Sequence, residues 1–158
     1  MMSFKQLVEM LNHEYGTFAA VKPSASTMEE IIKWCKANNI QNPIAPNDLH
    51  CTLAFSKVPA PTLKDHIFDL PITAKITKIS LFGDNHNCLV LELDSPALHA
   101  QHELIHDQYN LHYDWPDYKP HISVTYDFVG EMPTDVPTFP IVFDRAYVEP
   151  LEQPKDEK

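Results

Sequence analysis

The sequence contains very little glycine and arginine. Of its 158 residues three are glycine, whereas 14 are proline, and Arg145 is the only arginine. Few glycines and many prolines indicate loops with restricted backbone freedom. No apolar run approaches the roughly 20 residues that a membrane-spanning helix needs, and residues 1–10 lack the apolar block and cleavage site of a signal peptide. We therefore expect a cytoplasmic protein without membrane contact.

Cysteine and basic residues are also scarce. The three cysteines, Cys35, Cys51 and Cys88, are odd in number and form no C-x-x-C pair, which favours reduced, mostly buried structural thiols. Acidic residues number 22 against 12 basic ones, giving a net charge of −10. Long nucleic acids are held largely by clustered Lys and Arg. Since no such cluster occurs, no long RNA or DNA partner is expected, whereas a small anionic ligand needs only a few donors.

Hydrophobic periodicity predicts a single α+β domain over residues 1–152, followed by a frayed tail over residues 153–158. Helices are expected at 3–13, at 27–38 with Ser26 or Thr27 as N-cap, and from Ser95-Pro96 to about Tyr109. Strands are expected near 17–21, 49–56, 72–83, 87–94, 121–128 and 139–149. Residues 83–86 carry a hairpin signal between two of these strands.

Two of the expected strands carry the same polar pattern. Alternation turns one face of each strand toward the core. The residues of these two core faces are Leu49, Cys51, Leu53 and Phe55, and Ile122, Val124, Tyr126 and Phe128. The opposite faces present His50 with Thr52 and His121 with Ser123. One such pair is common on a polar strand face, but two copies of H-x-[S/T]-apolar in matching positions indicate a shared role.

Cleavage of a phosphodiester explains why these side chains would be repeated. Attack by a neighbouring 2′-hydroxyl needs a base that removes its proton and an acid that protonates the leaving 5′-oxygen. Histidine suits both roles because its ordinary pKa is about 6.5. In-line displacement requires one imidazole on each side of phosphorus. Thr52 and Ser123 could donate hydrogen bonds to the non-bridging oxygens.

The segments Leu49-His50-Cys51-Thr52-Leu53 and Pro120-His121-Ile122-Ser123-Val124 resemble the paired signatures of the two-histidine (2H) phosphoesterase superfamily. The order of elements resembles that superfamily along nearly the whole chain. The resemblance implies a bilobal α+β domain in which two pseudo-symmetric antiparallel β-sheet lobes, with flanking helices, surround a central groove. It carries the catalytic roles to His50, Thr52, His121 and Ser123, and it implies neither a metal nor a cofactor.

Within the superfamily, the start Glu14-Tyr15-Gly16-Thr17-Phe18-Ala19 and the His-Cys-Thr-Leu form of the first motif look most like the anti-CBASS phosphodiesterases of tailed bacteriophages. That resemblance implies cyclic di- and trinucleotide substrates, made as alarm signals by a bacterial host in whose cytoplasm the protein would act. Ser123 stands where threonine is more usual, but the hydroxyl remains. By resemblance and position, Tyr15, Phe18, Tyr118 and Glu149 could contact the bases. The alternatives are core packing for the aromatic residues and a solvated strand end for Glu149.

Three other interpretations remain open. His102-Glu103-Leu104-Ile105-His106 matches H-E-x-x-H of zinc proteases, but His112 follows too closely for a third ligand, and a half-buried helix histidine is the simpler account. An enzyme that processes RNA ends through 2′,3′-cyclic phosphates would use the same four residues. A nucleotide-sequestering protein would need no intact motifs. The sequence does not reveal which cyclic nucleotides are preferred, which histidine is the acid, or the oligomeric state.

Overall fold

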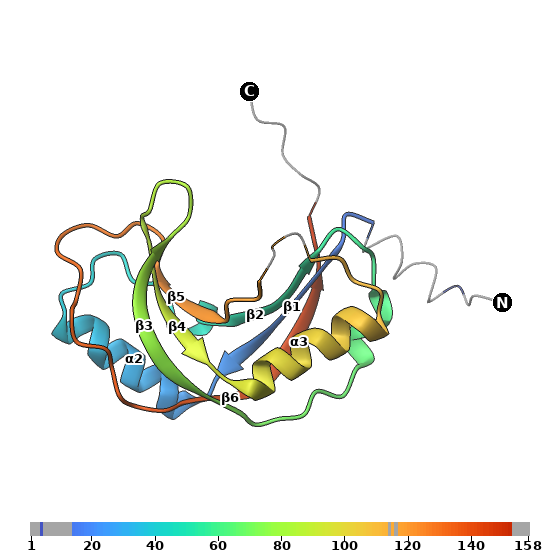
Figure 1. The fold of residues 1–158 in the computed structure, drawn as a ribbon, viewed down its shortest axis with the longest axis horizontal. Helices are drawn as coiled ribbons and strands as arrows, with labels where there is room; N and C mark the ends of the chain where they lie inside the picture. The colour runs from blue at the N-terminus through green and yellow to red at the C-terminus, as the bar shows by residue number, and fades with distance from the viewer. Residues whose placement is uncertain (1–3, 5–13, 114, 116, 153–158) are drawn as a thin grey trace.

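The computed structural model describes Phe4, residues 14–113, Trp115 and residues 117–152 (Figure 1). The longer elements are β1 (Thr17–Pro23), α2 (Ala25–Ala37), β2 (Cys51–Ser56), β3 (Ile72–Phe82), β4 (Cys88–Asp94), α3 (Pro96–Gln108), β5 (His121–Thr125) and β6 (Ile141–Pro150). These elements agree in type and order with those expected from the sequence. Apart from Phe4, the helix expected over residues 3–13 lies outside the described residues, as does the tail 153–158.

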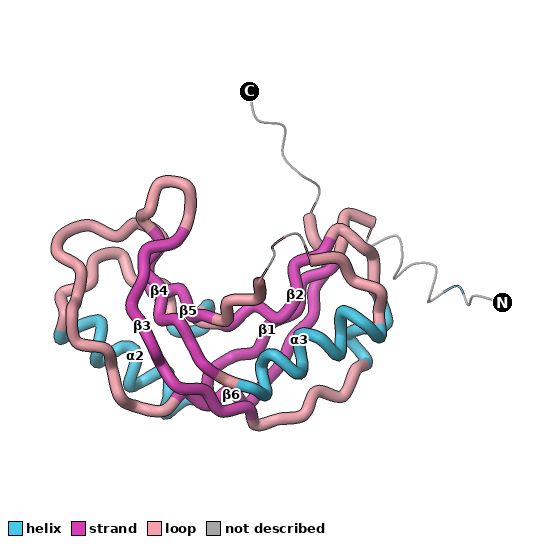
Figure 2. Tube along the Cα trace, in the orientation of Figure 1, coloured by secondary structure: helices cyan, strands magenta, loops and turns pink. Residues whose placement is uncertain are grey.

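The strands form one antiparallel sheet in the order β2-β1-β6-β3-β4-β5. Strand β6 pairs with β1 along seven positions but with β3 only through residues 72–74 and 141–143. The sheet therefore divides into two three-stranded halves, β2-β1-β6 and β3-β4-β5, joined by this short pairing. It is strongly curved, and both helices lie on its convex side (Figures 1 and 2). The α+β fold with two lobes around a concave face is confirmed.

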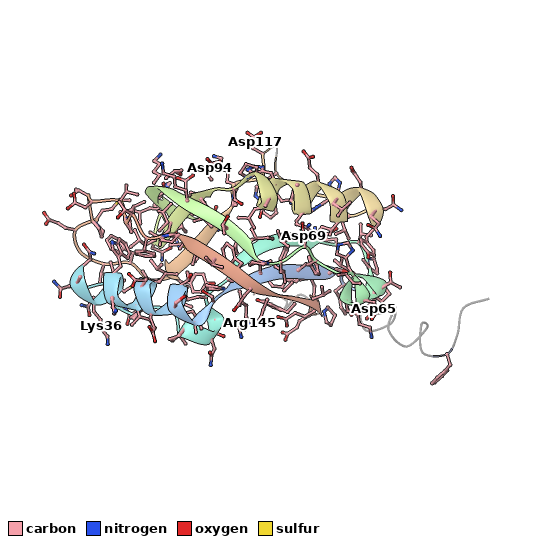
Figure 3. All side chains as sticks on the ribbon, turned by 90° about the horizontal axis from the view of Figure 1, so that it is seen from below. Lys36, Asp65, Asp69, Asp94, Asp117 and Arg145 are labelled. Carbon is pink, nitrogen blue, oxygen red and sulfur yellow. The ribbon has the colours of Figure 1, made fainter. Side chains whose placement is uncertain are left out.

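Each helix begins at a serine cap and covers the sheet with apolar side chains. The Ser24 hydroxyl accepts from the Thr27 backbone N–H at 3.3 Å, so the expected cap at Ser26 or Thr27 is wrong because α2 starts two residues earlier. Ser95 caps α3 as expected, accepting from the Leu98 N–H at 3.2 Å. Seen from below, the two helices lie on opposite sides of the strands that cross the middle of the view (Figure 3). The largest fully buried side chains include Ile31, Leu53, Leu91, Leu98, Ile122 and Phe143.

The cysteines behave as structural thiols. Cys35 and Cys51 are buried, Cys88 is half-buried, and none of the three forms a disulfide. Burial raises the pKa of the Cys51 thiol to about 11, so it carries a proton at neutral pH. Within the described part of the chain, neither helix has the length and apolar character needed to cross a bilayer.

Candidate active site

The first motif lies at the start of edge strand β2. Leu49, Cys51 and Leu53 are buried, whereas His50 and Thr52 are half-buried on the other face. Nδ1 of His50 lies 2.8 Å from the carbonyl oxygen of Asp48. Because a carbonyl oxygen can only accept, Nδ1 carries the proton in this bond, which leaves Nε2 of the neutral ring as the acceptor. The local backbone thus fixes the tautomer and the direction of this imidazole.

The second motif repeats that geometry at the start of β5. Nδ1 of His121 donates to the carbonyl of Lys119 at 2.7 Å, again two residues before the histidine. Each imidazole also has an aromatic neighbour set edge-on. The ring centroids of Phe18 and His50 are 5.7 Å apart at 80°, and those of Phe82 and His121 are 4.9 Å apart at 72°. The two halves therefore hold their histidines in the same way.

The curved sheet brings the two motif strands together. Strands β2 and β5 stand at opposite ends of the strand order but contact each other. The Tyr118 hydroxyl, three residues before His121, donates to the Thr52 carbonyl at 2.7 Å across this contact. The Ile44 N–H donates to the Val124 carbonyl at 2.8 Å nearby. Imidazoles from distant parts of the chain thus lie in one region of the concave face.

The surroundings of His121 shift its pKa. Burial lowers its pKa from the ordinary value, and the nearby imidazole of His50 lowers it further, while the bond to Lys119 and the charge of Glu92 act in the opposite direction. Glu92 is the partner of His121 across the β4–β5 pairing. The effect of the His50 imidazole on the pKa of His121 is an electrostatic sign that the two rings lie near each other. A lowered pKa keeps His121 neutral at the pH where a base is needed.

The two hydroxyls have different surroundings. Thr52 lines the same hollow as His121, and its backbone carbonyl is the acceptor for Tyr118. The Ser123 hydroxyl accepts from the Cys88 thiol, with Sγ 3.4 Å from Oγ. Ser123 is half-buried and borders neither of the two hollows next to the motifs.

Two hollows flank the motifs. The first, of about 850 Å³, contains His50 and many charged and polar side chains, and we call it the polar hollow. Its lining includes Lys22, Asn47, Asp48, Tyr126, Arg145, Tyr147 and Glu149. The second, of about 550 Å³, contains Thr52 and His121 and is mostly apolar, and we call it the aromatic hollow. Its lining includes Phe55, Phe82, Tyr113, Trp115, Tyr118 and Lys119.

The four residues expected to contact bases lie in different places. Glu149 lines the polar hollow, and Phe18, its partner across the β1–β6 pairing, packs against His50 and Tyr147. Tyr118 lines the aromatic hollow, but one face of its ring stacks on His102 at 4.0 Å and 3°. Tyr15 precedes β1, is 36% exposed and borders neither hollow.

Two aromatic residues expected in the core point outward instead. Phe55 is 45% exposed and Tyr126 is 58% exposed. The β1–β2 pairing shifts register between Ala19 and Ala20, a bulge that reverses the alternation beyond it, so Ala54 is buried and Phe55 faces the aromatic hollow. Strand β5 ends at Thr125, which frees Tyr126 from the strand pattern. Strict alternation along an unbroken strand could not reveal either change.

The H-E-x-x-H segment of α3 has a structural role. His102 is buried, and its Nδ1 lies 2.8 Å from the Leu53 carbonyl. Nδ1 of His106 lies 2.6 Å from the His102 carbonyl. Burial lowers the pKa of both rings, and His102 supports Tyr118 by stacking. Among the described residues, no group of three or more His, Cys, Asp or Glu side chains is arranged to hold a metal ion.

Comparison with known proteins identifies relatives over nearly the whole chain. A family model described as anti-CBASS protein Acb1 matches residues 15–158. The anti-CBASS protein Acb1 of Acinetobacter phage Ac42 is 32% identical over 148 residues, covering 87% of this chain and 91% of that protein. The protein of the same description from Enterobacteria phage T4 is 28% identical over 152 residues, covering 92% and 95%.

Several solved structures share the fold of this chain. E. coli LigT complexed with phosphate has a TM-score of 0.60 and 21% identity, covering 84% of each chain. A crystal structure described as a phosphoesterase has a TM-score of 0.62 and 19% identity, covering 86% of this chain and 95% of that one. At these identities the likeness concerns the fold.

Proposed function

Because the chain belongs to the family of the anti-CBASS protein Acb1, we propose that it is a phosphodiesterase that hydrolyses the 3′–5′ linkages of small cyclic oligonucleotide signals, so that a phage evades a host defence triggered by them. The observation that carries the activity is the pair of imidazoles, each held by its Nδ1–H on the carbonyl two residues earlier. Both rings then present Nε2 for proton transfer, as acid/base cleavage requires.

His121 is the proposed base and His50 the acid. Burial keeps His121 neutral, so its Nε2 can take the proton of a ribose 2′-hydroxyl. The 2′-oxygen forms a bond to phosphorus while the bond from phosphorus to the 5′-oxygen breaks, and His50, protonated for this step, gives its proton to that oxygen. The products are a 2′,3′-cyclic phosphate and a free 5′-hydroxyl. Water then opens the cyclic phosphate with the two roles exchanged.

Thr52 and Ser123 are the proposed donors to the phosphate. A neutral hydroxyl can donate to a non-bridging oxygen whose negative charge is held between the histidines. Neither is a nucleophile. The proposed chemistry uses side chains alone, so turnover should survive exhaustive chelation, whereas loss of activity on chelation, restored by zinc, would favour metal catalysis.

The polar hollow supports a small anionic ligand despite the net charge of −10. Lys22 and Arg145 both line it, and the Lys22 ammonium lies 5.0 Å from the centre of the Tyr147 ring. Glu149 can accept from an exocyclic amine, and Phe18 and Tyr147 supply aromatic surface beside His50. Tyr15 and Tyr118 remain proposed base contacts, although the stacked His102 leaves only one face of Tyr118 for that purpose.

Replacing either histidine tests the proposal. We expect His50→Ala and His121→Ala each to reduce kcat for a cyclic dinucleotide on the order of 10²–10⁴-fold, with binding retained. His86→Asn, in the exposed hairpin turn and with a positive φ that asparagine tolerates, is the matched control and should keep full activity. The measurement is product separation with steady-state kinetics.

Three outcomes would contradict the proposal. Binding of the cyclic nucleotide without any product would indicate a sequestering protein. Faster turnover of oligoribonucleotides with 2′,3′-cyclic ends than of cyclic dinucleotides would indicate an RNA-end enzyme. Undiminished cleavage of a 2′-deoxy substrate would show that the ribose hydroxyl is not the nucleophile.

A further inference from the structure

The aromatic hollow exposes large apolar side chains that the proposed proton transfers do not use. Phe55 is 45% exposed and Trp115 is 53% exposed, and both line the hollow with Phe82 and Tyr113. Single exposed apolar residues are ordinary, but several gathered in one concavity mark a binding site. The aromatic hollow is therefore a candidate ligand-binding site.

The chain places Phe55 there through a local irregularity. Regular alternation would turn Phe55 into the core with Cys51 and Leu53, but the register shift opposite Ala19 and Ala20 brings it to the concave face. Bulges commonly re-aim a side chain next to an active site. There the Phe55 ring lies edge-on to Phe18, with the ring centroids 6.5 Å apart.

The hollow opens beside the reacting groups. Thr52 and His121 form part of its wall, and the Phe82 ring lies 4.9 Å from the His121 ring. Its volume of about 550 Å³ falls within the range of about 300–1,000 Å³ typical of small-molecule pockets. Lys119 and Asp117 add charged groups to the lining. A flat, apolar-faced group joined to a phosphate fits this combination.

We propose that the aromatic hollow is a nucleoside subsite, in which Phe55 and Trp115 hold the nucleobase of the nucleotide on the His121 side of the scissile phosphate. This inference rests on the proposed function and specifies its substrate. The Trp115 ring is in contact with Tyr113, with centroids 5.3 Å apart, and aromatic faces stack any base. The second nucleotide then lies toward His50 and the polar hollow.

Two hollows that each hold a base, one on each side of the phosphate, would distinguish two classes of substrate. An internal 3′–5′ linkage joins two nucleosides, so it can fill both hollows at once. A 2′,3′-cyclic mononucleotide has one nucleoside and can fill only one of them. The binding energy of the second base is therefore available only to the dinucleotide linkage.

The test uses substrates that each lack one base. Steady-state kinetics are measured for a cyclic dinucleotide and for two linear diribonucleotides, one abasic at the first ribose and one abasic at the second. We expect Trp115→Ala and Phe55→Ala to raise KM for the cyclic dinucleotide on the order of 10-fold, the size of one lost stacking contact, with a smaller change in kcat. The nucleoside on the His121 side carries the attacking 2′-hydroxyl and is therefore the first of the linkage. The same variants should raise KM for the substrate that is abasic at the second ribose and leave KM unchanged for the substrate that is abasic at the first.

Controls separate this inference from folding and from the proposed function. Ile67→Ala removes a side chain that is 91% exposed and lies outside the hollow, and it should change neither KM nor kcat. Titration of the inactive His50→Ala protein with cyclic dinucleotide should change the fluorescence of Trp115, a signal that Trp115→Phe removes. An unchanged KM in both aromatic variants, or an equal effect on both abasic substrates, would overturn the subsite. A wild-type protein that cleaves none of the substrates would instead overturn the proposed function.

Discussion

The two imidazoles are fixed alike by their own backbone but have different neighbours. In both cases Nδ1–H bonds the carbonyl two residues earlier. His50 and Asp48 line the polar hollow, whereas His121 lines the aromatic hollow, where its ring meets that of Phe82 edge-on. The H-x-[S/T] pattern identifies both histidines in the sequence, yet it cannot reveal this difference, because the neighbours come from other strands.

The acid limb of the pH–rate profile should reflect protonation of His121. Burial disfavours the imidazolium and lowers the pKa, so the base stays neutral below the ordinary value of about 6.5. We expect kcat/KM to fall on the acid side only below that value. Phe82→Ala admits water, raises the pKa of His121 and should move this limb to higher pH, whereas Ile67→Ala should not move it. A limb that stays in place in Phe82→Ala would contradict the assignment of His121 as base.

At the level of elements, Tyr118 joins the two motifs. Its hydroxyl donates to the Thr52 carbonyl at 2.7 Å and lies 3.7 Å from the Cys51 sulfur, while His102 of α3 stacks on its ring. The loop that leads into β5 is thereby tied to β2. Tyr118 is thus suited to set the spacing of His50 and His121 in addition to any contact with a base.

Removing that hydroxyl should affect catalysis more than binding. Tyr118→Phe deletes a bond worth about 1 kcal/mol net, so we expect kcat to fall about 5-fold while KM changes little. Tyr109→Phe is the matched control, because the Tyr109 hydroxyl lies 3.1 Å from Nδ1 of His66 and Tyr109 lines neither hollow. Kinetics at saturating substrate measure the effect. A rise in KM without loss of kcat would mean that Tyr118 acts through the ligand instead.

The start of β1 depends on a glycine that no other residue can replace easily. Gly16 has φ +124°, and an added Cβ would lie 2.1 Å from the Ser56 carbonyl oxygen. Gly16→Ala should therefore lower the free energy of unfolding by more than the roughly 1–3 kcal/mol of backbone strain alone. Gly83 has φ +92°, but a Cβ added there would meet no atom within 4 Å. Gly83→Ala therefore measures the backbone strain without the steric clash. Urea unfolding of both variants checks the order, and equal losses would contradict it.

The elements themselves could be predicted well from the sequence, and their exceptions have local causes. Apolar spacing, the Ser95-Pro96 start and the turn at residues 83–86 predict α3 and the β3–β4 hairpin because each is a short-range signal. Phe55 was predicted to face the core and is exposed, since the bulge opposite Ala19 and Ala20 depends on pairing between strands. The lining of the hollows, including Tyr147 and Trp115, depends on the same long-range pairing.

For the whole molecule, the curvature of the sheet makes the site. The strands at the two ends of the order, β2 and β5, carry the two motifs and contact each other across the curved sheet, whose halves pair as strands through residues 72–74 and 141–143. Repetition of the motif suggests two related halves, but the sequence contains no local signal for the angle between them. The position of the hollows on either side of the histidines follows from that angle.

The charge of the whole molecule should decide which phosphodiesters it accepts. With 22 acidic residues against 12 basic ones, a polynucleotide would bring many phosphates against a negative surface, whereas Lys22 and Arg145 in the polar hollow need to meet only one or two. Binding of long nucleic acid gains strength from many released counterions, a gain that this surface cannot supply. We expect an excess of single-stranded polyuridylate to leave turnover of a labelled cyclic dinucleotide unchanged, while unlabelled cyclic dinucleotide competes fully. If polyuridylate inhibits turnover and the inhibition falls steeply with added salt, a positively charged surface must bind the polynucleotide. That result would contradict the preference for small ligands.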